Sequence, residues 1–206
     1  MRHRVVLAVG SNLGDRLGTL QGCVQAIGGL GDTDVLAISP VYETAPVGGP
    51  AQPDYLNAVL ITTTGLPPLD LLTATQGIEA EFGRVRTQGP QGAQGAQGPQ
   101  GPQGAQGPQG PQRPQGAERF GPRTLDIDVI SYAEQISGDP MLTLPHPRAH
   151  ERAFVLAPWH DVDAGASLPG RGPVAGLLAG LDRHGVRRQP DMVLRCPEPG
   201  APDQIS

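Results

Sequence analysis

The sequence predicts an α+β fold in which helices pack on an antiparallel sheet. The first observation is the order of its periodic segments, which is strand, helix, strand, strand, helix, strand. The second is its length, because 206 residues suit a single domain, expected over 1–206. The third is a further helical stretch after the last strand, which adds a C-terminal extension. The order matches the ferredoxin-like βαββαβ pattern.

The first four elements lie in the first third of the chain. Residues 4–10 form a short apolar run typical of a strand, and a turn-like SNLGDR follows. Residues 16–30 predict an amphipathic helix, because apolar side chains recur there at spacings of three and four. Residues 34–44 and 54–64 predict two strands, of which the second ends in three β-branched threonines.

The next predicted element is a helix that begins at two prolines. The pair at 67–68 suits the start of a second helix, which we expect to end near Gly83. Residues 124–132 are a strongly β-type run, and the Leu-containing stretch 173–184 predicts a last helix. We expect residues 185–206, which are rich in Pro and Arg, to be a flexible tail.

A low-complexity tract interrupts this order. Residues 88–117 consist of 10 Gln, 9 Gly, 6 Pro, 4 Ala and one Arg, arranged as Gln-Gly-Pro and Gln-Gly-Ala triplets. Glycine at every third position is a collagen-like period. The tract has no apolar side chains to bury, and Arg113 replaces one of the glycines. We therefore expect a disordered insertion rather than a triple helix.

Composition argues against several classes of protein. The formal charge of −5 and the small number of aromatic residues disfavour a nucleic-acid-binding face. No run approaches the roughly 18 apolar residues of a membrane helix, and the N-terminal apolar run is too short for a signal peptide. Cys23 and Cys196 form no spaced motif, so we expect a reducing, cytoplasmic setting. The chain has no lysine, so phosphate binding would need arginine, main-chain N–H groups or metal.

Two carboxylates on one strand are the sharpest chemical signal. Asp126 and Asp128 alternate with apolar residues, so in a strand both project from one face, about 6.6 Å apart along the chain. Mg²⁺ is typically bound by one or two carboxylates together with waters and substrate phosphates. A solvated strand face is the alternative. The nearby Arg119 and Arg123 favour the metal site, because arginine can bind phosphate beside the metal.

Three other groups of residues could carry chemistry. Residues 10–16 (GSNLGDR) could bind an anion where the first helix begins, although simple capping of that helix explains them equally well. Tyr55 and Asn57 share a strand face, where they could bind a flat heterocycle or form an ordinary surface pair. His146 and Arg152 belong to a polar cluster without a zinc motif, so phosphate contacts are the better interpretation.

Five blocks of sequence together resemble one known family. The blocks are GSNLGDR at 10–16, SPVYETAPVG at 39–48 with QPDYLNAV at 52–59, QGIEAEFGRVR at 76–86, RFGPRTLDIDV at 119–129 and LPHPRAHERAFVLAP at 144–158. They resemble the 6-hydroxymethyl-7,8-dihydropterin pyrophosphokinases of folate biosynthesis. The resemblance implies transfer of the pyrophosphoryl group of ATP to the hydroxymethyl group of the pterin, release of AMP, and two Mg²⁺ ions as cofactors.

The same resemblance assigns roles to individual residues. It implies that Asp126 and Asp128 bind metal and that Arg86 and Arg123 join them in catalysis. The implied ATP-binding residues are Gln76, Glu79, Arg86, Arg119, Arg123, Thr143, His146 and Arg152. The implied pterin-binding residues are Thr44, Val47, Tyr55, Asn57, Phe120 and Phe154. Tyr55 and Phe154 would enclose the ring, and Asn57 would bind its edge.

The repeat is the departure from this family. It lies between Arg86 and Arg119, within what resembles the mobile catalytic loop. Thirty extra residues would cost only about 1.2 kcal/mol of loop-closure entropy, so we expect an active enzyme. The alternatives are another magnesium-dependent phosphoryl or nucleotidyl transferase, and a non-enzymatic protein trimerised by the collagen-like segment. We expect a monomer that binds ATP and the pterin, and neither nucleic acid nor membrane.

Overall fold

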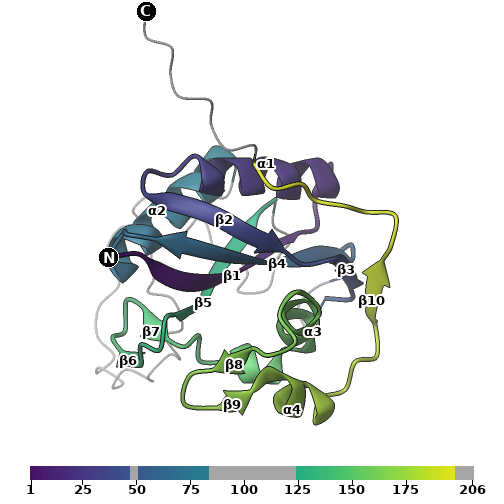
Figure 1. Cartoon of the computed structure of the whole chain (residues 1–206). Coiled ribbons are helices and arrows are strands. Elements are labelled where there is room, and N and C mark those ends of the chain that lie inside the picture. The colour runs from purple at the N-terminus through teal and green to yellow at the C-terminus, as the bar shows by residue number, and fades with distance from the viewer. Residues whose placement is uncertain (47–50, 84–123, 198–206) are drawn as a thin grey trace, which may run out of the picture.

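The computed structural model describes residues 1–46, 51–83 and 124–197, which form one antiparallel sheet with helices on both faces (Figure 1). The strands of the sheet are β1 (His3–Ser11), β2 (Thr33–Ile38), β3 (Val41–Thr44), β4 (Tyr55–Thr64), β5 (Asp126–Tyr132) and β10 (Val186–Gln189). Their order is β10-β3-β4-β1-β5, and β2 also pairs with β4. Every pairing is antiparallel. The mixed fold with an antiparallel sheet is therefore confirmed.

Two helices cover one face of the sheet. They are α1 (Arg16–Gly28) and α2 (Pro68–Glu81). Leu20 of α1 and Leu71 of α2 join Leu7 of β1 in one hydrophobic core, and all three are fully buried. The side chain of Asp15 accepts a hydrogen bond from the Gly18 N–H at 2.9 Å and so caps α1. Capping thus accounts for part of the 10–16 motif.

The second face of the sheet carries two helices that follow β5 in the chain. Helices α3 (Ala153–Val162) and α4 (Val174–Ala179) lie on the side of the sheet opposite α1 and α2 (Figure 1). Val59 of β4, Trp159 of α3 and Leu178 of α4 belong to the core on this side. The smaller elements are the hairpins β6 (Ser137–Gly138) with β7 (Thr143–Leu144) and β8 (Ser167–Leu168) with β9 (Gly172–Pro173), and the 3₁₀ turn η1 (Ala149–Glu151).

The single strand expected over 34–44 is two strands. The strand is interrupted at Ser39 and Pro40, which lie between the end of β2 and the start of β3. Proline has no N–H to donate, which disfavours a continuous ladder. Ser39 bridges the break, because its N–H donates to Val59 O (2.9 Å) and its hydroxyl accepts from Val59 N–H (2.8 Å). Both pieces therefore still pair with β4.

The C-terminal segment also differs from the flexible tail expected from residue 185. Residues 186–189 form β10, which pairs with β3 and extends the sheet. Further on, Leu194 is buried in the core beneath α1, and Arg195 exchanges two hydrogen bonds of 2.9 Å with the side chain of Gln21. The expectation is therefore wrong for 186–195, where main-chain pairing and apolar burial hold the segment in place. Residues 198–206 and the 88–117 repeat lie outside the described residues.

No helix within the described ranges combines the length and the apolar character needed to cross a lipid bilayer.

Candidate active site

Asn57, Gly10 and Asp126 form a row across three neighbouring strands. Asn57 of β4 is paired with Gly10 of β1, and Gly10 is paired on its other side with Asp126 of β5. Directly paired residues of an antiparallel sheet present their side chains on the same face. Strands lie about 4.8 Å apart, so Asn57 and Asp126 are separated by about 10 Å with only a glycine between them. This face is the one that carries α3 and α4.

Asp126 and Asp128 project from one face of β5, as their spacing predicts. Both are partly exposed, whereas Ile127 between them is fully buried in the core between the sheet and helices α1 and α2. Asp128 is paired with Ala8. The lateral neighbours of the two aspartates on β1 are therefore Gly10 and Ala8, the two smallest residue types. No large side chain of β1 therefore lies directly beside the carboxylates.

Asp128 is held by two residues from the turn before α3. The Arg152 Nη1 donates to Asp128 Oδ2 at 2.9 Å, and His146 Nε2 lies 3.9 Å from the same oxygen. His146 Nδ1 accepts a hydrogen bond from the Arg148 main-chain N–H (3.2 Å), so the proton of the neutral ring sits on Nε2, facing Asp128. Burial lowers the pKa of His146, with Asp128 opposing that shift. His146 and Arg152, which were predicted to bind phosphate, therefore lie next to Asp128, one of the two predicted metal ligands.

Arg152 also contacts a predicted pterin residue. It occupies the N-cap position of α3, and its guanidinium carbon lies 5.5 Å from the centre of the Phe154 ring. This distance is within the range of a cation–π contact. The start of α3 therefore brings one predicted phosphate ligand and one predicted ring-stacking residue together.

Thr44 and Asn57 form a fixed polar pair on the other side of Gly10. Asn57 Nδ2 donates to Thr44 Oγ1 at 2.7 Å, and both residues are buried. A Cβ built on Gly10 would lie 2.8 Å from Asn57 Oδ1 and 3.8 Å from Tyr55 Cδ1. Asn57 and Tyr55 therefore both approach the space above Gly10, which confirms that they share a face.

The 10–16 motif supports the segment that leads into Tyr55. Asn12 is 1% exposed, and its Nδ2 donates to Gln52 Oε1 (3.0 Å) and to Pro53 O (3.1 Å). Arg16 Nη1 donates to Asp54 O (2.7 Å) and pairs with Glu43 Oε1 (3.0 Å). These supports were not among the predicted site residues. The sequence signal for them is the GSNLGDR block at 10–16, which contains both Asn12 and Arg16.

The hydrogen bond from Arg16 is also the main reason why the pKa of Glu43 is lowered. Arg187 of β10 approaches the same carboxylate, with its Nη2 3.3 Å from Glu43 Oε2, and it also pairs with Asp54 at 3.2 Å. The first turn of α1, strand β3, strand β10 and the segment before β4 are therefore joined by one charged network.

The other predicted site residues lie on β7, on α2 or outside the described ranges. Thr143 is on β7, and its hydroxyl donates to Asp139 O at 3.1 Å within its own hairpin. Gln76 is half-buried on α2, whereas Glu79 of the same helix is fully buried and accepts a hydrogen bond from the Ile127 N–H at 2.8 Å. Five predicted residues lie outside the described ranges: Val47, Arg86, Arg119, Phe120 and Arg123. Within those ranges, no cluster of three or more His, Cys, Asp or Glu side chains could bind a metal by itself.

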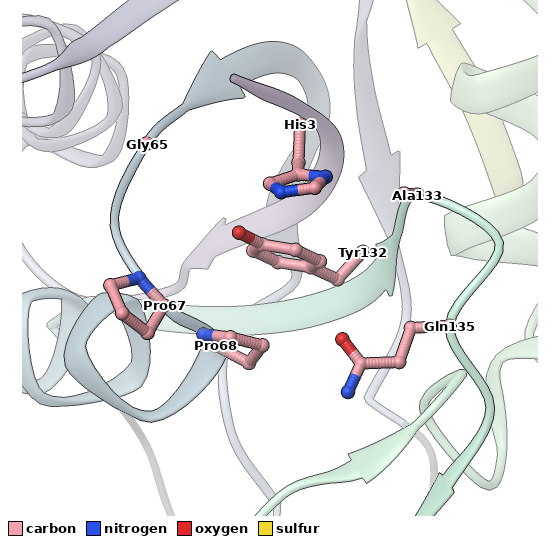
Figure 2. A pocket seen from close by; sticks show the side chains of 7 residues that line it. All are labelled: His3, Gly65, Pro67, Pro68, Tyr132, Ala133 and Gln135. Carbon is pink, nitrogen blue, oxygen red and sulfur yellow. The ribbon is translucent and has the colours of Figure 1, made fainter. Parts of the chain in front are cut away.

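A separate pocket of about 380 Å³ lies at the opposite end of the sheet (Figure 2). Its walls come from the beginning of β1 and the end of β5, where the rings of His3 and Tyr132 are 5.2 Å apart at a tilt of 37°. Gly10 and Asp126 lie at the other ends of these two strands. The pocket is lined by His3, Gly65, Pro67, Pro68, Tyr132, Ala133 and Gln135, and contains none of the predicted site residues.

Comparison with known proteins identifies the family. The family model described as 7,8-dihydro-6-hydroxymethylpterin-pyrophosphokinase matches residues 6–93 and 109–164. The chain belongs to this family. The resemblance predicted from the five sequence blocks is therefore confirmed. The break in the match, between 93 and 109, falls inside the Gln-Gly-Pro repeat.

Relatives of this pyrophosphokinase family match over most of the chain. Three of them are named 2-amino-4-hydroxy-6-hydroxymethyldihydropteridine pyrophosphokinase. The protein of Pseudomonas aeruginosa is 35% identical over 92% of this chain and 99% of its own length. The protein of Mycobacterium leprae is 40% identical over 87% of this chain and 80% of its own length. The protein of Mycobacterium tuberculosis H37Rv is also 40% identical, over 89% of this chain and 88% of its own length.

Solved structures agree with the fold. The Plasmodium falciparum HPPK-DHPS structure with pterin and p-hydroxybenzoate has a TM-score of 0.55 at 11% identity, over 87% of this chain. An HPPK-DHPS structure in complex with substrates has a TM-score of 0.57 at 10% identity, over 86% of this chain. This chain spans about two fifths of those chains, 42% and 43%. At such identities the likeness supports the fold alone.

Proposed function

We propose that this chain transfers the pyrophosphoryl group of ATP to the hydroxymethyl group of 6-hydroxymethyl-7,8-dihydropterin, releasing AMP, in folate biosynthesis. The observation that carries the proposal is the row Asn57–Gly10–Asp126. It puts an amide suited to the edge of a heterocycle and a carboxylate suited to a metal on one face of the sheet, and the residue between them on the middle strand is a glycine. Family membership disfavours the other transferases and the non-enzymatic alternative.

The pterin would lie above Gly10. Asn57 is fixed by Thr44, so its Oδ1 stays directed at this space and can accept a hydrogen bond from the ring edge. Tyr55 borders the same space, and Phe154 would enclose the ring from the start of α3. We assign Val47 and Phe120 to the same pocket on the family pattern alone.

Asp126 and Asp128 are suited to Mg²⁺. Their donors are hard carboxylate oxygens on one strand face, and the β1 residues paired with them are the small Gly10 and Ala8. Two carboxylates suit a metal that completes its coordination with substrate phosphates and water, and two Mg²⁺ ions are the number that the family pattern implies. Bound Mg²⁺ would neutralise the charge of the triphosphate and orient it.

The side chains around Asp128 would bind the triphosphate. A guanidinium has five N–H donors, so Arg152 can hold Asp128 through Nη1 and still donate to phosphate oxygens. His146 presents its Nε2–H on the same side. We assign the ATP-binding role to Gln76, Arg86, Arg119, Arg123, Thr143, His146 and Arg152, whereas Glu79 of the same implied set is fully buried.

In this proposal the hydroxyl oxygen of the pterin is the nucleophile. It forms a bond to the β-phosphorus of ATP and loses its proton to solvent. The bond from that phosphorus to the oxygen bridging to the α-phosphate breaks, so AMP leaves with that oxygen. Positioning and charge stabilisation supply most of the rate in such reactions, with no covalent enzyme intermediate. Arg86 and Arg123 would stabilise the developing charge.

The test is to incubate the purified chain with ATP, Mg²⁺ and the hydroxymethyl pterin and to identify the nucleotide product. AMP formed one-to-one with the pterin diphosphate is the expected result. ADP as the nucleotide product would indicate a different phosphoryl transferase, and no pterin-dependent turnover would refute the proposal.

The finer classification of the fold belongs to the same proposal. The order β3-β4-β1-β5, with α1 after β1 and α2 after β4, supports a ferredoxin-like βαββαβ core whose second strand is divided into β2 and β3. In this scheme α3, α4 and β10 form the C-terminal extension, residues 1–206 are one domain, and 88–117 is an insertion in its catalytic loop. We also propose that the enzyme is monomeric and cytoplasmic.

A further inference from the structure

Glu79 is a fully buried carboxylate at the edge of the sheet. It lies near the end of α2, and its Oε1 accepts a hydrogen bond from the main-chain N–H of Ile127 at 2.8 Å. Burying a carboxylate is costly unless hydrogen bonds replace its hydration. Its placement here therefore needs a structural or functional reason.

The position of this bond suggests the reason. Ile127 is the residue between Asp126 and Asp128, and β5 is the last strand in the order of the described sheet. An edge strand has main-chain groups that no neighbouring strand binds. The Glu79 carboxylate binds one such group at the midpoint of the aspartate pair, while β1 binds the strand from its other side.

We propose that Glu79 is a positioning residue, which fixes the spacing and direction of Asp126 and Asp128 through the Ile127 main chain. The inference rests on the metal-binding role given to these aspartates in the proposed function. It assigns Glu79 a different task from the direct ATP contact that the family pattern implies. Residues that orient metal ligands typically change metal affinity by about 10- to 100-fold when they are removed.

The surroundings of Glu79 agree with this task. Its side chain enters the core shared by α1, α2 and the sheet, where Cys23 of α1 is also fully buried. Burial and the nearby Glu79 charge both raise the pKa of the Cys23 thiol. A carboxylate whose Oε1 faces the main chain of β5 inside this core is placed to support the strand from behind the aspartates.

Two substitutions separate the hydrogen bond from the charge. Glu79→Gln keeps an acceptor oxygen and removes the charge, whereas Glu79→Met keeps the length of the side chain and removes the acceptor. Thr75→Val is the matched control. Thr75 is equally buried one turn earlier on α2, but its hydroxyl bonds only within the helix, to Leu72 O at 2.9 Å.

The measurements are hydrogen exchange of the Ile127 amide by NMR and binding of Mn²⁺, observed by electron paramagnetic resonance, in the presence of an α,β-methylene ATP analogue. We expect Glu79→Met to accelerate exchange at Ile127 and to weaken Mn²⁺ binding about 10- to 100-fold. Glu79→Gln should retain the protection of Ile127 and most of the Mn²⁺ affinity. Thr75→Val should change thermal stability without changing either quantity.

Two results would overturn the inference. If Glu79→Gln weakens Mn²⁺ binding as much as Glu79→Met, the carboxylate charge acts directly on metal or nucleotide. If Glu79→Met folds and binds Mn²⁺ like the wild type, Glu79 is only a core residue. Should Glu79→Met fail to fold, Glu79→Gln alone still decides between positioning and direct contact. None of these readouts needs turnover, so they are independent of whether the wild type releases AMP.

Discussion

Replacing Gly10 by alanine should damage pterin binding while leaving the fold intact. The added Cβ would lie 2.8 Å from Asn57 Oδ1, closer than real Cβ contacts, and Asn57 has little freedom to move because it is held by Thr44 at 2.7 Å. Accommodating one extra methyl in such a place costs about 1–3 kcal/mol. Displacing Asn57 would also sacrifice a buried hydrogen bond, worth about 1 kcal/mol.

Asn57 is therefore displaced before the pterin binds, and returning it to its binding position would cost the complex about 1–3 kcal/mol. The pterin Kd should then rise about 5- to 150-fold, since 1.4 kcal/mol corresponds to a factor of about ten. Isothermal titration calorimetry with the pterin, compared with titration of an ATP analogue, measures this directly. ATP analogue binding should change much less, because the clash is with Asn57 and not with the aspartates.

Gly176→Ala is the matched control for this experiment. Gly176 lies in α4, and a Cβ built there meets nothing within 4 Å. The same chemical change should therefore leave the pterin Kd unaltered and stabilise the helix slightly. A Gly10→Ala protein that binds pterin as tightly as Gly176→Ala would show that the space above Gly10 is not the pterin site.

Four further predictions concern Asp128, the two cysteines, Glu43 and the repeat. Asp128→Ala should abolish AMP formation while circular dichroism shows an intact fold, and an active, folded variant would refute the metal assignment. Native alkylation followed by mass spectrometry should label exposed Cys196 and spare buried Cys23 until denaturant is added; equal labelling would contradict that burial. Because the pKa of Glu43 is lowered on folding, its contribution to stability is full above about pH 5 and is lost as the pH falls through the lowered pKa. Urea titrations at pH 7 and pH 3 should therefore differ less for Glu43→Gln than for the wild type, and an equal difference would count against the Arg16 contact. Deletion of 88–116 should preserve or raise turnover, so an inactive deletion variant would mean that the insertion is required.

The elements with simple periodicity could be predicted from the sequence. Short apolar and β-branched runs predicted β1, β4 and β5, and the spacing of Asp126 and Asp128 was enough to place both on one face, because side-chain direction in a strand depends only on the local period. The pairing of these strands then brings Asn57 and Asp126 to opposite sides of Gly10.

Elements that depend on distant partners could not be predicted in this way. Residues 34–44 have enough β character for one strand, and the break at Pro40 depends on how Ser39 bonds to β4. Strand β10 is short, and two of its four residues are arginines. It is held by pairing with β3 and by the contacts of Arg187 with Glu43 and Asp54, none of which a local pattern reveals.

The same distinction separates the two kinds of site residue. Side chains that would contact substrate or metal, such as the buried Asn57 and the partly buried Asp128, occupy strand positions where a polar residue is unexpected, and so they are visible in the sequence. Side chains that hold main-chain atoms, such as Arg16 on Asp54 O and Glu79 on Ile127 N–H, look like ordinary polar residues of a helix. Their role depends on which strand their helix covers. Sequence motifs therefore mark Arg16 and Glu79, but they do not show that these side chains hold the main chain on which the binding groups lie.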